Sequence, residues 1–258
     1  MLDAMGRSRA HELPRSLGDP CLFSLDPGKH LHLDRGEALR YLGYTGQDIA
    51  PELMERIDLA IDEVENGARP RGVRAVFPID ASSLDGAGAP CIRLTGTTVV
   101  LRGRDIYRHL KDARWCALLA CTLGMDNERR LRTLASQHPL EGAVFDAASS
   151  AAIEAAVERM DRAVRRAARD AGLSCNWRFS CGYGDCPLDV QPSILAAVDA
   201  TRRCGISTTA TDLLLPSKSV TAMIGIFEGA PHAADAPARC SICRMRTTCS
   251  LRSRGVTC

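Results

Sequence analysis

Apolar residues recur along the chain with two different periods. Where they stand three or four positions apart they predict amphipathic helices, and where they alternate with polar residues or form short runs they predict strands. The predicted helices cover residues 51–66, 105–110, a segment that starts near 127, 146–171 and 192–203. The predicted strands cover residues 73–79, 91–94, 98–102, 115–120, 173–180 and 220–227. Because helices and strands do not alternate strictly and two strands form a hairpin, the pattern predicts an α+β fold.

The same pattern divides the chain into three parts. Residues 1–33 show no period and contain scattered Pro, Gly and Arg, so we expect a loosely ordered N-terminal extension. Residues 34–228 contain all the predicted elements, which indicates a single mixed domain with a twisted, largely antiparallel sheet and flanking helices. Residues 229–258 begin as a linker of Ala, Pro and polar residues and end as a short Cys-rich C-terminal tail.

The longest predicted helix, over residues 146–171, separates apolar from charged positions. From Ile153 onward an apolar residue recurs at every third or fourth position, and we expect this stripe to face the core. Arginines on the opposite face could form a row that binds anions, but they alternate with acidic residues such as Glu154, Glu158 and Asp161. The alternation favours a solvated helix face.

Composition narrows the class of partner. The 258 residues carry a formal net charge of +2, so no strong field for nucleic acid or for an anionic membrane is expected. No apolar run reaches the length of a membrane span, and the N-terminus lacks the apolar core of a signal peptide, which predicts a soluble, cytoplasmic protein. The sequence contains no dinucleotide-binding, phosphate-loop, zinc-protease or hydrolase motif, so those enzyme classes lose their usual support.

One loop combines residues suited to holding a ligand. In residues 178–187, between a predicted strand and a predicted helix, Gly182 and Gly184 flank Tyr183, so the backbone can approach a ligand while the ring points outward. The guanidinium of Arg178 is a forked donor that suits a carboxylate. The alternative is a tight turn with a packed tyrosine and a structural arginine. The loop alone does not decide between the two.

An ordered set of segments extends this pattern over residues 37–228. It contains Arg178-x-x-x-Gly182-Tyr183, Pro187 and Leu215-Pro216-Ser217-Lys218-Ser219-Val220-Thr221, with weaker matches at Leu39-Arg40-Tyr41-Leu42-Gly43, Thr122-Leu123-Gly124 and the start of the long helix. The set resembles the reactivation module of cobalamin-dependent methionine synthase, which binds S-adenosylmethionine, in its free-standing form.

The resemblance implies a function. In that family the module docks over the corrin of an inactive cob(II)alamin and presents S-adenosylmethionine while a reductant supplies one electron, which restores methylcobalamin. The chain would then be a reactivation partner of a separate cobalamin-carrying methionine synthase or related corrinoid methyltransferase, and would also need an electron donor. Whether it is an enzyme or an activating component stays open.

The resemblance also implies ligand-binding residues. Arg178 would hold the methionine carboxylate, the Gly182 backbone would line the ligand, Tyr183 would press against the ligand and the corrin edge, and residues 216–221 would close the other wall. The implied binding set is Arg178, Cys181, Gly182, Tyr183, Gly184, Pro216, Ser219 and Val220. Two departures stand out: Cys181 occupies a position where the family usually has proline, and no residue matches the acidic one that holds the ligand's amine.

The C-terminal tail carries a possible metal site. Cys240, Cys243, Cys249 and Cys258 form a Cys-x-x-Cys pair followed by two further thiols, enough for a tetrahedral zinc site or an iron–sulfur cluster. The alternative is a tail of reduced thiols. An iron–sulfur cluster would supply the electron, which zinc cannot, and it leads to an alternative function: an iron–sulfur protein that reduces a corrinoid protein without binding S-adenosylmethionine. A further alternative is a module that only binds a cobalamin domain.

The other cysteines divide into two groups. Cys116, Cys121 and Cys204 lie in apolar surroundings, and we expect them to be small buried hydrophobic residues. Cys181 and Cys186 flank the Gly-Tyr-Gly segment, where they could form a redox pair or supply extra metal ligands.

Overall fold

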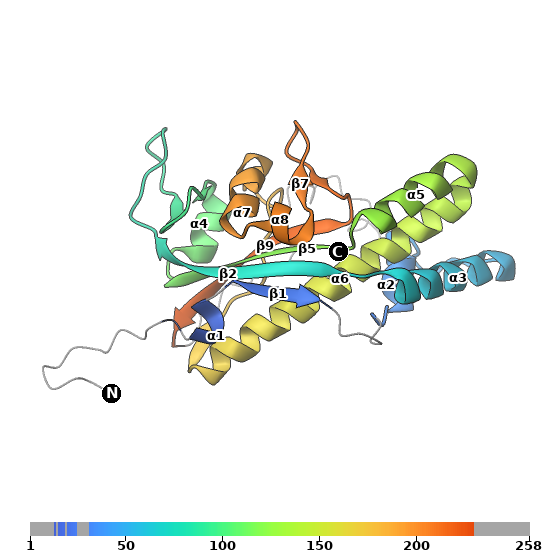
Figure 1. Cartoon of the computed structure of the whole chain (residues 1–258), viewed down its shortest axis with the longest axis horizontal. Helices are drawn as coiled ribbons and strands as arrows, with labels where there is room; N and C mark the ends of the chain where they lie inside the picture. Colours follow the sequence, from blue (N-terminus) through green and yellow to red (C-terminus); the bar gives the residue numbers. More distant parts are fainter. Residues whose placement is uncertain (1–12, 14, 19, 25–30, 230–258) are drawn as a thin grey trace, which may run out of the picture.

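The computed structural model describes residues 13, 15–18, 20–24 and 31–229, and at its centre lies a seven-stranded sheet (Figure 1). Its strands are β1 (Cys21–Ser24), β2 (Arg71–Asp80), β3 (Ile92–Leu94), β4 (Val100–Leu101), β5 (Trp115–Thr122), β6 (Leu173–Cys175) and β9 (Ser219–Glu228). Every pairing is antiparallel in the order β4-β3-β2-β5-β9-β6, with β1 also paired to β2. A second, two-stranded sheet joins β7 (Ser207–Thr208) and β8 (Leu214–Leu215). The predicted α+β class and antiparallel sheet are confirmed.

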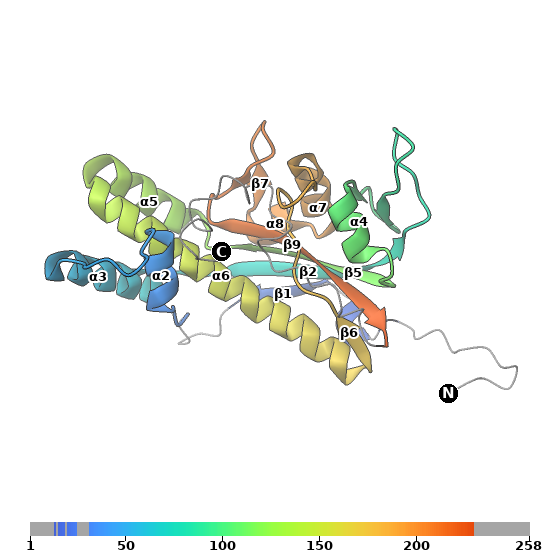
Figure 2. The ribbon, with the colours of Figure 1, turned by 180° about the vertical axis from the view of Figure 1, so that it is seen from behind.

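Helices cover both faces of the large sheet (Figures 1 and 2). One face carries α1 (Arg15–Gly18), α2 (Arg35–Tyr41), α3 (Pro51–Gly67), α5 (Met125–Gln137) and the long α6 (Pro139–Asp170). The other face carries α4 (Arg104–Leu110), the short 3-10 helix η1 (Leu188–Val190), α7 (Gln191–Ala197) and α8 (Ala200–Cys204). Each face therefore has its own apolar core. None of the described helices combines the length and the apolar character needed to cross a bilayer.

Strand β5 lies between the two cores. All eight of its residues are buried, and each pairs with β2 on one side and with β9 on the other. Its side chains alternate between the cores, so that Leu118 faces α4, α7 and α8 and Leu119 faces α6. Burial on both faces explains why the sequence reads here as an unbroken apolar run. Cys116, Cys121 and Cys204 are buried as predicted, and burial raises the pKa of the first two thiols to about 12.

The long helix differs from its predicted start. It begins at Pro139, in the first helical turn, where proline is tolerated because that amide has no intrahelical partner. Helix α5 ends immediately before it at Gln137, so the two form a tight helical hairpin. At this crossing a Cβ added to Gly142 would lie 2.8 Å from the Cα of Ala135. Backbones this close leave room for glycine alone.

Two other predicted elements are interrupted. The helix expected over residues 192–203 is divided into α7 and α8 at Asp199, whose backbone is left-handed with φ 55°. The strand expected over residues 173–180 ends at Cys175. At the next residue the contact with β9 includes a side chain: the Oδ1 of Asn176 accepts a hydrogen bond from the amide of Gly225 at 2.7 Å. Phe179 then pairs with Met223 as an isolated bridge.

The sequence shows no period for α1, β1 and α2, yet these elements pack on the domain. Leu17 of α1 and Leu31 are buried in the core that contains α6, and β1 pairs with the first half of β2. Asp34 begins α2 because its carboxylate accepts a hydrogen bond from the amide of Gly36 at 2.7 Å.

The helical hairpin provides a test of the packing. We expect Gly142→Ala to lower the free energy of unfolding by about 1–3 kcal/mol, because the new methyl group overlaps the α5 backbone, although alanine is the better helix former. Gly67→Ala is the matched control, since a Cβ at the last residue of α3 has no atom within 4 Å. Urea unfolding monitored by circular dichroism measures both. Equal stability of the two variants would contradict the close approach.

Candidate functional site

Three carboxylates of α6 surround the guanidinium of Arg178. Glu154, Glu158 and Asp161 stand four and three residues apart, so they share one face of the helix. The Arg178 Nη2 lies 3.2 Å from Glu154 Oε2 and 3.5 Å from Glu158 Oε2, and its Nε lies 3.9 Å from Asp161 Oδ2. We call these three residues the α6 acidic row.

Burial separates the roles of the row. The side chain of Asp161 is only 7% exposed and also pairs with Arg165 at 2.9 Å, so it is a structural anchor. Glu154 and Glu158 are 43% and 44% exposed and can exchange partners with a ligand. The predicted solvated face is therefore wrong at Asp161. The sequence could not show that Arg178, many residues later, covers this carboxylate.

Helix α2 adds an aromatic ring beside the row. Burial and, secondarily, the negative charge of Glu154 raise the pKa of Tyr41. The guanidinium of Arg40 stacks over the Tyr41 ring with 4.4 Å to the ring centroid, and it also pairs with Glu37. Tyr41 therefore stands within the electrostatic range of the carboxylate that contacts Arg178.

A second cation, Lys218, contacts α6 one to two helical turns before Glu154. The Nζ of Lys218 is 2.8 Å from Asp146 Oδ1 and 2.9 Å from the Oγ of Ser150. Along α6, Lys218 and Arg178 thus flank Glu154, and both reach the helix from the β9 side of the sheet. The result is a strip of alternating charge that can accept groups of either sign.

The loop around Tyr183 is fixed by α4. The carboxylate of Asp185 accepts hydrogen bonds from the amides of Arg104 at 2.7 Å and Asp105 at 3.0 Å, so it caps α4 from a distant part of the chain. Gly184 has a φ of 54°, and a Cβ there would overlap the carboxylate of Asp105. These two contacts hold the loop against α4.

Within this loop the thiols are internal and the tyrosine is external. Cys181 and Cys186 are buried, and a hydrogen bond between the two thiols, together with burial, raises the pKa of Cys181 far above its ordinary value. The backbone closes the turn, with the amide of Gly182 donating to the carbonyl of Cys186 at 2.9 Å. Tyr183 is 62% exposed. The loop therefore presents its ring to the surface on a packed base.

Residues 216–221, which were predicted to form the second wall of the ligand site, lead into β9. Pro216 is buried, and the Oγ of Ser219 donates to the Oγ1 of Thr122 at 2.8 Å. Val220 packs on the core that contains α6. Ser217 is anchored by its amide and its hydroxyl to Glu128 Oε2 of α5, at 2.8 and 2.6 Å. The hydrogen bonds of this segment hold it against α5 and β5.

The structure brings together some of the predicted site residues and separates others. Arg178 and Val220 lie on the side of the sheet that faces α6, whereas Cys181 packs in the opposite core. The loop that contains Gly182, Tyr183 and Gly184 follows Phe179, which pairs with Met223 of β9. Sequence reasoning did not place Glu154 and Glu158 beside Arg178, or Tyr41 within the electrostatic range of Glu154. The regular spacing of carboxylates on α6 was the available signal.

A buried histidine supports the segment that leads into the loop. His109 of α4 is 8% exposed, its Nε2 lies 2.9 Å from the carbonyl oxygen of Trp177, and its ring contacts Trp177 edge-on. Asn176 donates to the carbonyl of His109 at 2.7 Å. Burial lowers the pKa of His109 to about 4, so the imidazole is neutral near pH 7.

The predicted metal site cannot be compared with this arrangement. Cys240, Cys243, Cys249 and Cys258 lie outside the described residues, and the site remains a prediction. Within residues 13, 15–18, 20–24 and 31–229, no group of three or more His, Cys, Asp or Glu side chains is placed to hold a metal ion.

Comparison with known proteins gives a fold relationship. No family model matches the sequence, and curated proteins give no significant match. Among solved structures, the chain is similar to the crystal structure of the MetH reactivation domain bound to AdoHcy, with a TM-score of 0.59 and 15% sequence identity. The similarity covers 92% of this chain and 86% of that one, so it extends over the whole architecture.

His109 predicts a pH dependence of stability. Because its pKa is about 4 in the folded protein against 6.5 in the unfolded chain, the unfolded chain binds more protons between these values. The contribution of neutral His109 to the free energy of unfolding is complete above about pH 6.5. It falls by up to about 1.4 kcal/mol per pH unit as the pH drops toward 4. In urea unfolding at several pH values, His109→Gln should flatten this slope; an unchanged slope would contradict a neutral His109.

The cap on α4 provides a second test at this site. Asp185→Ala should lower the free energy of unfolding by about 1–2 kcal/mol, because two amides lose their acceptor. Asp189→Ala is the matched control: this neighbouring carboxylate pairs with Arg102 on the surface, where an ion pair contributes about 0.5 kcal/mol. Thermal unfolding compares them. If Asp185→Ala were no more destabilising than Asp189→Ala, the loop would not be fixed through α4.

Proposed function

We propose that this protein is a reactivation partner of a cobalamin-dependent methionine synthase and that it binds S-adenosylmethionine as the methyl donor. The observation that carries the proposal is the mixed-charge cluster of Arg178, Glu154 and Glu158, close in the chain to a rigid loop that exposes Tyr183. The similarity of the fold to the MetH reactivation domain supports it.

The cluster suits the amino-acid end of S-adenosylmethionine. This end carries a carboxylate and an ammonium group, and the adjacent sulfonium adds a second positive charge. We assign the carboxylate to Arg178, and the ammonium to Glu154 and Glu158, which are half-exposed. Binding then exchanges one set of ion pairs for another, so no charge loses its partner. Glu154 and Glu158 would take the role of the acidic residue that the sequence comparison lacked.

In this reaction the protein contributes mainly by positioning the methyl donor. A sulfonium methyl group is already activated, and its transfer leaves S-adenosylhomocysteine as the product. The partner's cobalamin is the methyl acceptor, and an external donor supplies one electron, because cob(II)alamin is one electron short for accepting a methyl cation. In this chain, Arg178 and the acidic row would orient the ligand.

The exposed tyrosine gives the partner a defined contact. Tyr183 is 62% exposed although it sits between two glycines whose backbones are fixed against Cys186 and Asp105. An aromatic ring that loses little freedom on association is a typical anchor of protein interfaces. We therefore assign Tyr183 to the surface that meets the cobalamin-carrying protein.

Calorimetric titration with S-adenosylmethionine and S-adenosylhomocysteine tests the ligand. We expect Arg178→Ala to weaken binding roughly tenfold or more, because a charged hydrogen-bonding partner is lost. Arg178→Lys, which keeps the charge but not the fork, should fall between this variant and the wild type. Arg162→Ala, an exposed arginine of α6 outside the cluster, is the control and should bind as the wild type does.

Two results would contradict the proposal. One is absence of binding to the wild-type chain, both alone and with a cobalamin-loaded methionine synthase. The other is equal affinity of the Arg178→Ala and Arg162→Ala proteins, provided that both unfold at the wild-type temperature. Loss of the complex with the partner in Tyr183→Ala, with ligand affinity retained, would separate the docking role from the ligand role.

A further inference from the structure

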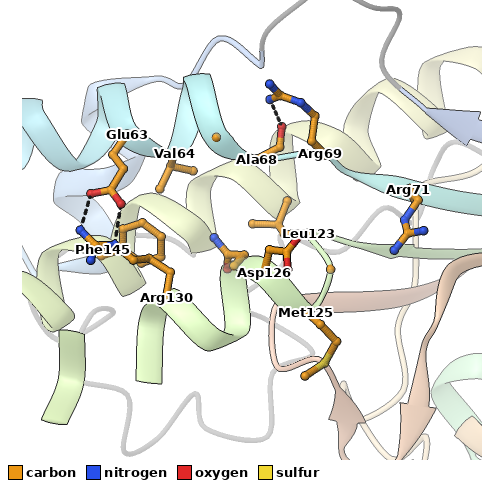
Figure 3. Close-up of a pocket in the computed structure, with 13 residues that line it drawn as sticks. Glu63, Val64, Ala68, Arg69, Arg71, Leu123, Met125, Asp126, Arg130 and Phe145 are labelled. Atoms are coloured by element: carbon orange, nitrogen blue, oxygen red, sulfur yellow. Dashed lines mark hydrogen bonds and ion pairs between the residues drawn. The ribbon is translucent and has the colours of Figure 1, made fainter. Parts of the chain in front are cut away.

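A pocket of about 510 Å³ opens where β5 passes into α5 (Figure 3). It is lined by residues of α3, α5 and α6 and by the start of β2, and it shares no residue with the Arg178 site. Its volume lies within the range of roughly 300–1,000 Å³ found for small-molecule sites. The turn between the two elements contains Thr122-Leu123-Gly124, a segment that the proposed function leaves unused.

One end of the pocket is cationic. Arg71 lies on the wall and forms no hydrogen bond or ion pair with any described residue. Arg69 donates only to backbone carbonyls, those of Asn66 and Ala68. The carboxylates of the wall are already occupied, since Glu63 pairs with Arg130 and Asp126 pairs with Arg129. Two arginines therefore remain without a carboxylate partner among the described residues.

The start of α5 adds donors at the same end. This helix has 13 residues, and its first residue follows Gly124, which provides no side-chain cap. The first amides of a helix have no intrahelical acceptor and carry a partial positive charge. Gly124 has a φ of 88°, and a Cβ placed there would be 3.9 Å from the Nη2 of Arg71. The free guanidinium thus stands beside the uncapped turn.

An unsatisfied side chain on the pocket wall points independently to a ligand. Asn127 lines the pocket and is only 8% exposed. Its Nδ2 donates to the Oγ of Ser149 at 3.0 Å, whereas its Oδ1 has no partner among the described residues. A buried amide group without a partner is unfavourable by about 1–3 kcal/mol. Because the Oδ1 is itself buried, a bound polar group relieves this only when the Asn127 side chain turns toward the pocket. Because a hydroxyl can donate or accept, Ser149 permits either orientation of the amide.

The opposite end of the pocket is apolar. Figure 3 shows Phe145 and Val64 on the side away from Arg71, with Leu123 between the two ends. We propose that this pocket binds a small organic oxyanion, a carboxylate or phosphate ester on an apolar body. The oxyanion meets Arg71 and the first amides of α5, Asn127 bonds a polar group next to it, and the body packs on Phe145 and Val64. The proposal is independent of the binding of S-adenosylmethionine.

Amide chemical shifts test this site directly. The ¹⁵N-labelled chain is titrated with phenyl phosphate, benzoate and inorganic phosphate at constant ionic strength. We expect saturable shifts of the Gly124, Met125, Asp126 and Asn127 amides, with tighter binding of the two aromatic anions than of inorganic phosphate. Comparing phenyl phosphate with benzoate identifies which oxyanion the site prefers. Shifts caused by S-adenosylmethionine are expected near Arg178 instead, so the two sites are read separately.

Variants decide whether the pocket is responsible. Arg71→Gln should raise the dissociation constant roughly tenfold or more, and Asn127→Ala should raise it to a smaller extent. Arg162→Gln, an exposed arginine outside the pocket, should have no effect. Because Arg71 is exposed, its replacement leaves the fold intact, which the remaining amide spectrum verifies. Shifts that do not saturate, or equal affinity of Arg71→Gln and wild type, would overturn the proposal.

Discussion

The complete burial of β5 is the constraint on which the rest of the structure depends. A strand that is paired along both edges and covered on both faces has no group exposed to water, so β2 and β9 must flank it and helices must cover both sides of the sheet. The candidate sites therefore lie at the periphery. The Arg178 cluster lies beyond β9, the Tyr183 loop rests on α4, and the pocket at Arg71 lies where β5 ends.

Charge on α6 shows how a helix face can serve tertiary structure. Glu154, Glu158 and Asp161 look like ordinary surface residues in the sequence, yet all three face Arg178. A buried carboxylate is tolerated only when it is paired, and Asp161 meets this condition with two arginines, Arg165 and Arg178. The more exposed carboxylates can change partners at little cost, which makes the outer part of the row suited to a charged ligand.

The Tyr183 loop is held in place by contacts with α4, a helix from an earlier part of the chain. Its glycines permit the backbone to approach α4, and Asp185 uses that approach to cap the helix. Below the loop, His109 and Asn176 join α4 to the segment that precedes it. A surface on such a base is organised in the free protein, and this arrangement lowers the entropic cost of association with any partner.

The α+β class, most helices and strands, and the unusual backbone around Gly182 and Gly184 could be predicted from the sequence, because periodicity and glycine act over a few residues. The sequence did not show the neighbours of Arg178, the cap that Asp185 places on α4, or the unpartnered Asn127 beside Arg71. Each of these joins residues that the strand order brings together from distant parts of the chain. Only the tertiary structure decided them, since local periods contain no information about which strand pairs with which.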